Sequence, residues 1–381
     1  MIAFGIILLY FITLKIKYFI DRNTIFIWGF IVVSLISLIT SIDFNLSLTA
    51  VFSNIFNILC FLLIYKVFNE KQIKTVLISV IIGLSIPLAD AYIQFFFGEP
   101  YTIKQGYETI RASGFIFKTP AWSAATMVFY LIMVLVFYNY FINGKLYEKM
   151  KLIVNKKIVV YVIIALLGIF IIGFRSAILV AMGYFILLAI FSGNITSKIK
   201  TFLFAICLLS VGLDLYSRYS PGGFLLLKQA VSPDYLLNPN PGVSTFASRL
   251  FYMKKYLFNF NLPIFGYGAG TFGLKNVISD SGSLYVNLWF SYGSLGFFTF
   301  ILFILKLLKD NLFSKPRIFI NSYLVIVILC ALVGGLSETT LLGTRGLYFF
   351  VLLGIISNRI NRYEYNFRES NVYIGNNLYK R

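Results

Sequence analysis

The run LYVNLWFSYGSLGFFTFILFIL, residues 284–305, contains 22 consecutive residues without a charged side chain. A helix of about 20 residues is about 30 Å long, which matches the hydrocarbon thickness of a bilayer. The apolar residues of this run do not alternate with a period of two, as those of a membrane β-strand do. Backbone groups inside a bilayer must pair within the chain, so the run predicts a transmembrane helix.

Comparable runs recur along the chain, which is 59% hydrophobic and only 12% charged. A soluble domain of 381 residues could not cover so much apolar surface. We therefore expect an all-α, polytopic integral membrane protein with about eleven transmembrane helices. The predicted spans lie near residues 2–19, 24–42, 47–67, 74–97, 120–142, 158–174, 176–193, 201–216, 284–305, 318–337 and 341–357.

One large polar loop, 217–283, is expected between the eighth and ninth spans. Of the 33 lysines and arginines, 22 fall in one alternating set of predicted loops and 11 in the other. The positive-inside rule places the richer set in the cytoplasm, so the 217–283 loop faces outward. The formal charge of +19 then reflects topology rather than nucleic-acid binding. Residues 1–358 form one membrane domain in this interpretation, and 359–381 form a polar cytoplasmic tail.

Four of the outward-facing arginines are expected at the membrane boundary: Arg111, Arg175, Arg249 and Arg345. An arginine next to hydrocarbon is costly unless it is paired or ligated, which makes each of them a functional candidate. Guanidinium groups bind phosphate through two parallel hydrogen bonds and stay charged at neutral pH. Several of them around one cavity would suit a pyrophosphate. The alternative is that each side chain reaches out to lipid headgroups.

A carboxylate is the expected general base, because the chain contains no histidine. Glu338 and Asp280 are the preferred catalytic candidates, since apolar spans flank each of them and favour a proton-accepting carboxylate. The alternative is that they pair with arginines, for instance Glu338 with Arg345. The carboxylates are too scattered to indicate a metal site, and we predict neither a metal nor a cofactor.

A glycine cluster, FGYGAGTFG at residues 265–273, stands near the end of the outward loop. Its last six residues match G-x-G-x-x-G, but no strand precedes them, so a dinucleotide site is rejected. The cluster indicates either a tight turn or a loop whose backbone N–H groups approach a phosphate. Nearby aromatic rings could stack on sugars, although an interfacial belt would also place Tyr and Trp there. The candidate loop or glycan-binding residues are Gly266, Tyr267, Gly268, Gly270 and Tyr285.

Several short stretches resemble the bacterial superfamily of O-antigen polymerases and O-antigen ligases (Wzy and WaaL). Members share many spans, a large outward loop late in the chain, a glycine-rich turn and arginine segments. The matching stretches here are RASGF at 111–115, FRSA at 174–177, RLFY at 249–252, FGYGAGTF at 265–272 and LYVNLWFSYGSLGF at 284–297. The resemblance covers most of the chain by architecture, although its motifs are short.

The resemblance implies a metal-independent membrane glycosyltransferase at the outer face of the bacterial inner membrane. Its donor would be a glycan on undecaprenyl pyrophosphate, with arginines such as Arg175 and Arg249 holding the leaving group. The implied activity is polymerisation of oligosaccharide repeat units into O-antigen or capsular polysaccharide, and a chain-length regulator protein is a possible partner. The ligase branch usually carries a histidine where this chain has DSGS at 280–283. That departure favours the polymerase branch.

Two alternatives to the polymerase are retained. The first is an O-antigen ligase that transfers finished glycan to lipid A or to a protein. The second, from a different class of protein, is a polysaccharide flippase or other transporter. Transporters often show repeated halves and charges at the middle of the bilayer. No repeat is visible in this chain, and its outward charges cluster outside the predicted spans.

Overall fold

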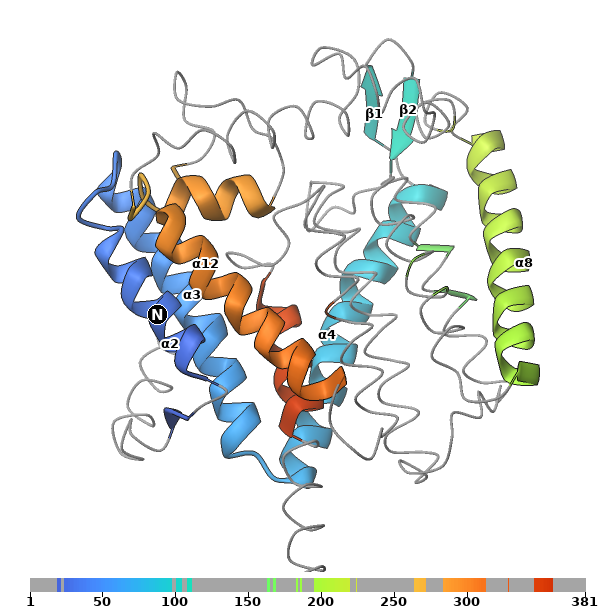
Figure 1. Cartoon of the computed structure of the whole chain (residues 1–381). Helices are drawn as coiled ribbons and strands as arrows, with labels where there is room; N and C mark the ends of the chain where they lie inside the picture. The colour runs from blue at the N-terminus through green and yellow to red at the C-terminus, as the bar shows by residue number, and fades with distance from the viewer. Residues whose placement is uncertain are drawn as a thin grey trace, which may run out of the picture.

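The computed structural model describes five stretches longer than four residues, a short hairpin, residues 19–21 and a few isolated positions. Five helices are labelled in Figure 1, and Gly346–Asn358 forms a further helix beside them. The long stretches are 24–97, 195–219, 264–271, 284–312 and 346–358, with 101–104 and 108–111 in the hairpin. The labelled helices are α2 (Ile25–Ile36), α3 (Phe44–Lys66), α4 (Glu70–Phe97), α8 (Ile195–Tyr219) and α12 (Leu284–Leu312).

Three of the described helices are long and apolar enough to cross a membrane: Phe44–Lys66, Lys71–Gln94 and Leu284–Lys309. They coincide with three of the predicted spans, so a helical membrane protein is confirmed. The predicted spans at 2–19, 120–142, 158–174, 176–193 and 318–337 fall outside the described residues, apart from isolated positions. The total of eleven spans and the extent of the large loop therefore stay predictions.

One predicted span is shorter than expected. In place of a span at 24–42, α2 ends at Ile36 and turns follow it. Hydroxyl groups just beyond that point bond to the local backbone, because Ser37 Oγ donates to Ser34 O at 2.8 Å and Thr40 Oγ1 to Ser37 O at 3.3 Å. Such local bonds compete with helix continuation. By contrast, α8 extends beyond both ends of the span predicted at 201–216.

A short hairpin is the departure from an all-α fold within the described residues. Strand β1 (Tyr101–Lys104) pairs antiparallel with β2 (Glu108–Arg111), with Tyr101 opposite Arg111 and Lys104 opposite Glu108. Both strands contain β-forming Thr and Ile, and the three residues between them include Gly106. The hairpin lies within the predicted 98–119 loop, beyond the end of α4 (Figure 1).

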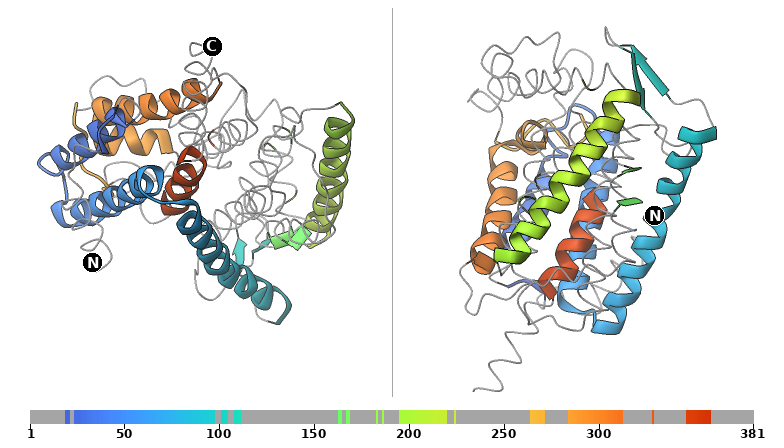
Figure 2. Two further views of the ribbon diagram at one scale, coloured as in Figure 1. Left: turned by 90° about the horizontal axis from the view of Figure 1, so that it is seen from below. Right: turned by 90° about the vertical axis from the view of Figure 1, so that its right-hand side faces the viewer.

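Helices α2, α3 and α12 pack together with Gly346–Asn358, while α8 stands on the far side of the molecule (Figures 1 and 2). Small residues permit the close approach. A Cβ built on Gly296 of α12 would lie 3.4 Å from Val33 of α2, and one built on Gly354 would lie 3.0 Å from Ile64 of α3. Aromatic rings fill the space between, with Phe61 of α3 5.5 Å from Phe303.

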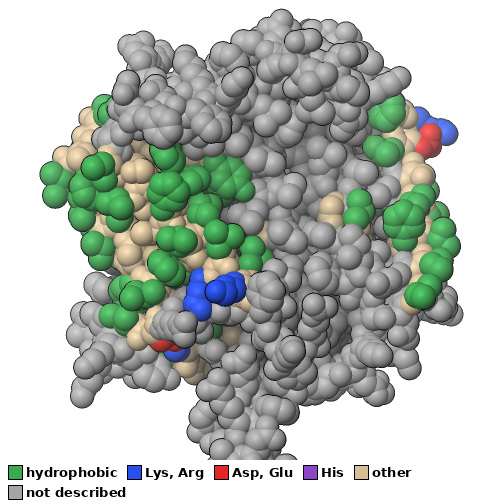
Figure 3. Space-filling view, in the orientation of Figure 1, with side chains coloured by type: hydrophobic (Ala, Val, Ile, Leu, Met, Phe, Trp, Pro, Cys, Tyr) green, Lys and Arg blue, Asp and Glu red, His purple; other side chains and the backbone are tan. Residues whose placement is uncertain are grey.

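Helix α12 has one buried and one exposed apolar face. The buried face includes Phe300, Phe303, Ile304 and Leu307, and the exposed face includes Leu295, Phe298, Leu302 and Leu305. Figure 3 shows apolar side chains covering the surface over α2, α3 and α12, with basic side chains at its lower edge. An exposed apolar helix face suits contact with lipid, and basic side chains at its margin suit the membrane interface.

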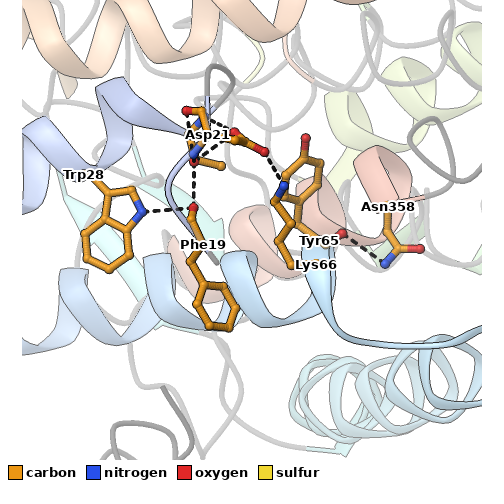
Figure 4. Close-up of polar contacts among 7 residues, drawn as sticks. Phe19, Asp21, Trp28, Tyr65, Lys66 and Asn358 are labelled. Carbon is orange, nitrogen blue, oxygen red and sulfur yellow. Dashed lines mark hydrogen bonds and ion pairs between the residues drawn. The ribbon is translucent and has the colours of Figure 1, made fainter. Parts of the chain in front are cut away.

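Polar contacts close one end of this helix group (Figure 4). The Asn358 amide donates to three carbonyls at the end of α3: Ile64 O at 2.6 Å, Tyr65 O at 3.2 Å and Phe68 O at 3.1 Å. The last carbonyls of a helix have no partner within the helix, so Asn358 caps α3 from another element. Lys66 also donates to the Asp21 carboxylate. We call these contacts the clasp.

The Asp21 carboxylate is charged at neutral pH. Partial burial alone would raise the pKa of Asp21, but the hydrogen bond and charge of Lys66, with hydrogen bonds from Thr24, outweigh it and lower that pKa. Its ion pair with Lys66 is therefore present at neutral pH and is lost only as the pH falls through the lowered pKa. The clasp joins segments that charge counting assigns to one side of the membrane, and the hairpin lies at the opposite end (Figure 1). Which end faces the cytoplasm stays a prediction.

The clasp generates a stability prediction. Asn358→Leu removes the donor to the α3 carbonyls and should cost about 1–3 kcal/mol, because buried polar groups are left unpaired. The neighbouring Ser357 is the matched control, since its buried hydroxyl has no hydrogen-bond partner. Ser357→Ala should be neutral or slightly stabilising. The measurement is the midpoint of thermal unfolding in detergent, and equal midpoints for the two variants would contradict the capping role.

Candidate functional site

Helix α12 is broken at Gly293. This residue has φ 66° and ψ −170°, a conformation that side chains with a Cβ rarely adopt. A Cβ at Gly293 would also collide with the Ile264 carbonyl. The break divides α12 into a short segment, starting at Leu284, and a longer one that runs to Leu312. The continuous apolar run at 284–305 predicts a span here, but it does not predict this interruption.

The glycine cluster forms a tight turn, 264–271, that lies against the break. Gly266, Gly268 and Gly270 all have positive φ, at 74°, 98° and 73°. The space around them is also restricted. A Cβ on Gly266 would come within 2.5 Å of Ser291 and Gly293 backbone atoms, and one on Gly268 would collide with two serine hydroxyls. Glycine is therefore required at these positions by backbone conformation and by close contact.

Backbone hydrogen bonds join the turn to the break. Tyr267 N donates to Phe290 O at 2.9 Å, and Gly268 N donates to Ser291 O at 3.1 Å. In the other direction, Leu295 N donates to Ile264 O at 3.3 Å. An interrupted helix leaves carbonyls before the break and N–H groups after it without intrahelical partners. The turn thus supplies partners from outside the helix, as a bilayer environment requires.

The turn is also attached to the start of α3. Ile42 N donates to Tyr267 O at 3.0 Å, and a Cβ on Gly270 would lie 3.1 Å from Ala50 Cβ. Within the turn, Thr271 Oγ1 donates to Gly268 O at 2.6 Å. We call the turn 264–271, the break at 290–295 and the segment 41–50 the junction. It joins three separate parts of the chain at the end opposite to the clasp.

A buried polar pair lies beside the junction. The Asn54 amide of α3 donates to the hydroxyl of Tyr292, the residue before Gly293. Both side chains are buried, and the Tyr292 ring packs 5.0 Å from the ring of Phe30 in α2. Asn54 is not among the residues singled out from the sequence, and Tyr292 lies in the resembling stretch 284–297 without a predicted role of its own. The sequence signal for Asn54 is its position inside a predicted span, because polar side chains inside a membrane are costly and tend to be paired.

The structure also places the two candidate tyrosines. The Tyr267 ring packs 4.8 Å from Phe290, and Tyr285 is half-buried in the first turn of α12. Nearby, the ring of Trp289 packs 5.1 Å from Phe297, and its indole N–H is buried without a hydrogen-bond partner. The Tyr267 and Gly268 amides already donate to Phe290 and Ser291, so the tight-turn interpretation of the cluster describes its geometry. Glycan binding by the turn stays a prediction.

The charged candidates are not brought together by any described contact. Arg175, Arg249, Arg345, Asp280 and Glu338 lie outside the described residues, and Arg111 is described only as the last backbone position of β2. At the end of α8, Arg218 forms an exposed ion pair with Asp214 at 3.0 Å. Among the described side chains, no group of three His, Cys, Asp or Glu residues could hold a metal ion.

No protein-family model matches the chain, and no curated protein matches its sequence significantly.

The junction predicts a contrast between two glycines in helices. Gly293→Ala should destabilise the protein by about 1–3 kcal/mol through backbone strain alone, before any loss of the hydrogen bonds to the turn. Gly83 in α4 is the matched control, because a Cβ there would meet nothing within 4 Å. Gly83→Ala should be neutral or stabilising, since Ala favours a helix by about 1 kcal/mol over Gly. Thermal unfolding in detergent measures both, and a Gly293→Ala protein as stable as Gly83→Ala would contradict the break.

Proposed function

We propose that this protein is a membrane glycosyltransferase that polymerises undecaprenyl-pyrophosphate-linked oligosaccharide repeat units into O-antigen or capsular polysaccharide. The observation that supports this best is the junction. Two of the stretches that resemble the polymerase and ligase superfamily, 265–272 and 284–297, are separated by eleven residues in the sequence. In the fold they are joined by backbone hydrogen bonds from Tyr267 to Phe290 and from Gly268 to Ser291. The contact makes the two motifs parts of one structural unit, and this supports treating them as a single functional element.

The proposed reaction joins two lipid-linked glycans. The terminal hydroxyl of the acceptor repeat unit attacks the anomeric carbon of the donor glycan, and the bond from that carbon to the pyrophosphate oxygen breaks. The hydroxyl proton passes to a carboxylate, for which Glu338 and Asp280 are the candidates. Undecaprenyl pyrophosphate leaves with the bonding electrons, and Arg175, Arg249, Arg345 and Arg111 are the candidate residues that stabilise its charge.

The proposal also specifies the cellular location of the reaction, its cofactor requirement and its protein partner. The candidate catalytic residues face outward from the bacterial inner membrane, where lipid-linked repeat units are available, and two of them, Arg249 and Asp280, belong to the 217–283 loop itself. The reaction needs no metal or cofactor in this scheme, because the arginines supply the positive charge. A chain-length regulator protein is the proposed protein partner.

The described break in α12 favours an enzyme over a transporter. Broken helices of transporters often use their freed backbone groups to bind substrates or ions near the middle of the bilayer. Here the Phe290 and Ser291 carbonyls and the Leu295 amide bond to the glycine turn instead. An O-antigen ligase is the second candidate within enzymes, and it is less favoured because the chain contains no histidine.

The arginine hypothesis is tested in cells that lack the native gene. Arg175→Ala and Arg249→Ala should each reduce polymer formation by about 100-fold or more, the usual effect of removing one group that stabilises developing negative charge. Lys309→Ala is the control, since Lys309 is an exposed cation at the clasp end of α12. Gel analysis of polysaccharide length is the measurement. Normal long chains from both arginine variants would rule out their role.

Gene deletion separates the polymerase from the ligase. Loss of a polymerase should leave single repeat units on the lipid carrier, because repeats are still made but not joined. Loss of a ligase should leave long glycans on the carrier, because they are made but not transferred. The lipid-linked glycans are extracted and their lengths compared with those of the parent strain.

A further inference from the structure

We propose that the junction is a positioning element, and that its glycines and Thr271 serve the glycan transfer by fixing the outward loop rather than by touching the glycan. The fixation itself is argued from geometry alone, while its effect on turnover rests on the proposed polymerase activity. The glycine turn lies at the late end of the 217–283 loop, and the next described element, α12, begins at Leu284. Holding the turn therefore fixes this loop at residues 264–271 against the break in α12.

The polar groups of the junction are directed inward. Four backbone amides at its contacts, those of Ile42, Tyr267, Gly268 and Leu295, donate to carbonyls within the junction. Ala269 is 1% exposed and Thr271 is fully buried. A binding loop of the phosphate-cradling kind would instead present its N–H groups to the ligand. The Tyr267 and Gly268 N–H groups thus bond to the protein itself. A ligand-binding turn would leave such N–H groups for its ligand.

The attachment is rigid because it holds the turn from two helices at once. The turn bonds to α12 on both sides of Gly293 and to the residue Ile42, just before α3. The hydroxyls of Ser41 and Ser47, which bond to each other at 2.6 Å, fill the space next to Gly268. Beside these contacts, Asn54 and Tyr292 tie α3 directly to α12. A shift of the turn would have to break contacts in both helices.

A positioning role has a specific kinetic consequence. Loosening an element that aligns reacting groups lowers the rate of the bound complex, and a misplacement of about 1 Å can cost about 100-fold. Loss of a direct glycan contact that is equally strong in the ground state would instead raise KM with kcat unchanged. Junction variants are therefore expected to lose kcat, with KM changed by less than about twofold.

The first experiment reports on the attachment without any assay of activity. Ala269→Cys is introduced into the full chain after Cys60, Cys207 and Cys330 have been replaced by Ala, and a membrane-impermeant maleimide is applied to intact cells or spheroplasts. We expect Ala269→Cys to be protected in this parent and in a parent carrying Gly83→Ala. Addition of Gly293→Ala should expose it to the reagent. Labelling of the parent itself, or continued protection with Gly293→Ala, would overturn the fixation.

A lack of labelling has two explanations, a closed junction and a reagent that does not reach the turn, and a control has to distinguish them. The cells are therefore also permeabilised and treated with the same reagent, and a denatured sample gives the full extent of labelling. Protection in permeabilised cells shows that the junction is closed, whereas labelling only after permeabilisation would place the turn in the cytoplasm. The latter result would contradict the outward orientation and the proposed function, and it would also remove the reason for fixing an outward loop.

The second experiment uses Thr271, whose substitution is milder than that of a glycine. Thr271→Val keeps the shape of the side chain but removes the hydroxyl that donates to Gly268 O, whereas Thr271→Ser keeps a donor. With purified protein and lipid-linked repeat units, Thr271→Val should lower kcat at least about fivefold with KM nearly unchanged. Thr271→Ser should restore most of the rate. A raised KM with unchanged kcat would assign the turn to glycan binding, and equal rates for Val and Ser would also reject the positioning role.

The two experiments separate failure of this inference from failure of the proposed function. If the wild-type protein does not elongate lipid-linked repeats but Ala269→Cys labels as expected, the polymerase assignment fails and the junction stands as an anchor of the loop. If the protein elongates repeats and Ala269→Cys is accessible from the start, the polymerase assignment stands and the positioning role fails. If Gly293→Ala prevents insertion into the membrane, Thr271→Val takes its place in the labelling experiment.

Discussion

The fold depends on a constraint that lipid imposes on the backbone. A helix that stops inside or at the edge of hydrocarbon exposes carbonyls and N–H groups that water cannot satisfy, so another part of the protein must pair with them. Helix α12 stops and restarts at Gly293, and the glycine turn pairs with groups on both sides of that point. The conformation of the turn, its glycines and its contact with α3 all follow from this requirement.

The two ends of the described helix group meet that constraint in different ways. At one end, backbone pairs with backbone, because the glycine turn can approach the break closely only in the absence of Cβ atoms. At the other, the side chain of Asn358 donates to three carbonyls at the end of α3. Each end also joins α3 or its start to a late part of the chain, through Ile42 and Tyr267 at one end and through Ile64 and Asn358 at the other. Helix packing and backbone satisfaction are therefore coupled at both ends.

The sequence predicts the apolar helices well and their interruptions poorly. Spans such as 284–305 are evident because hydrophobicity over 20 residues is a local property. The early end of α2 follows from hydroxyls of Ser37 and Thr40 that bond to nearby carbonyls, and a hydropathy window does not register such bonds. The break at Gly293 and the Asn54–Tyr292 pair depend on partners elsewhere in the chain. The convergence of Arg175 and Arg249 stays a prediction, because both lie outside the described residues.

The glycine cluster shows how a motif can resemble a ligand site for structural reasons. A nucleotide-binding loop and this turn both need glycine, one to admit a phosphate and the other to admit a neighbouring backbone. Spacing alone does not separate the two cases, but the direction of the N–H groups does. Since the Tyr267 and Gly268 amides donate to α12, these two N–H groups hold the protein backbone and are not available to a ligand.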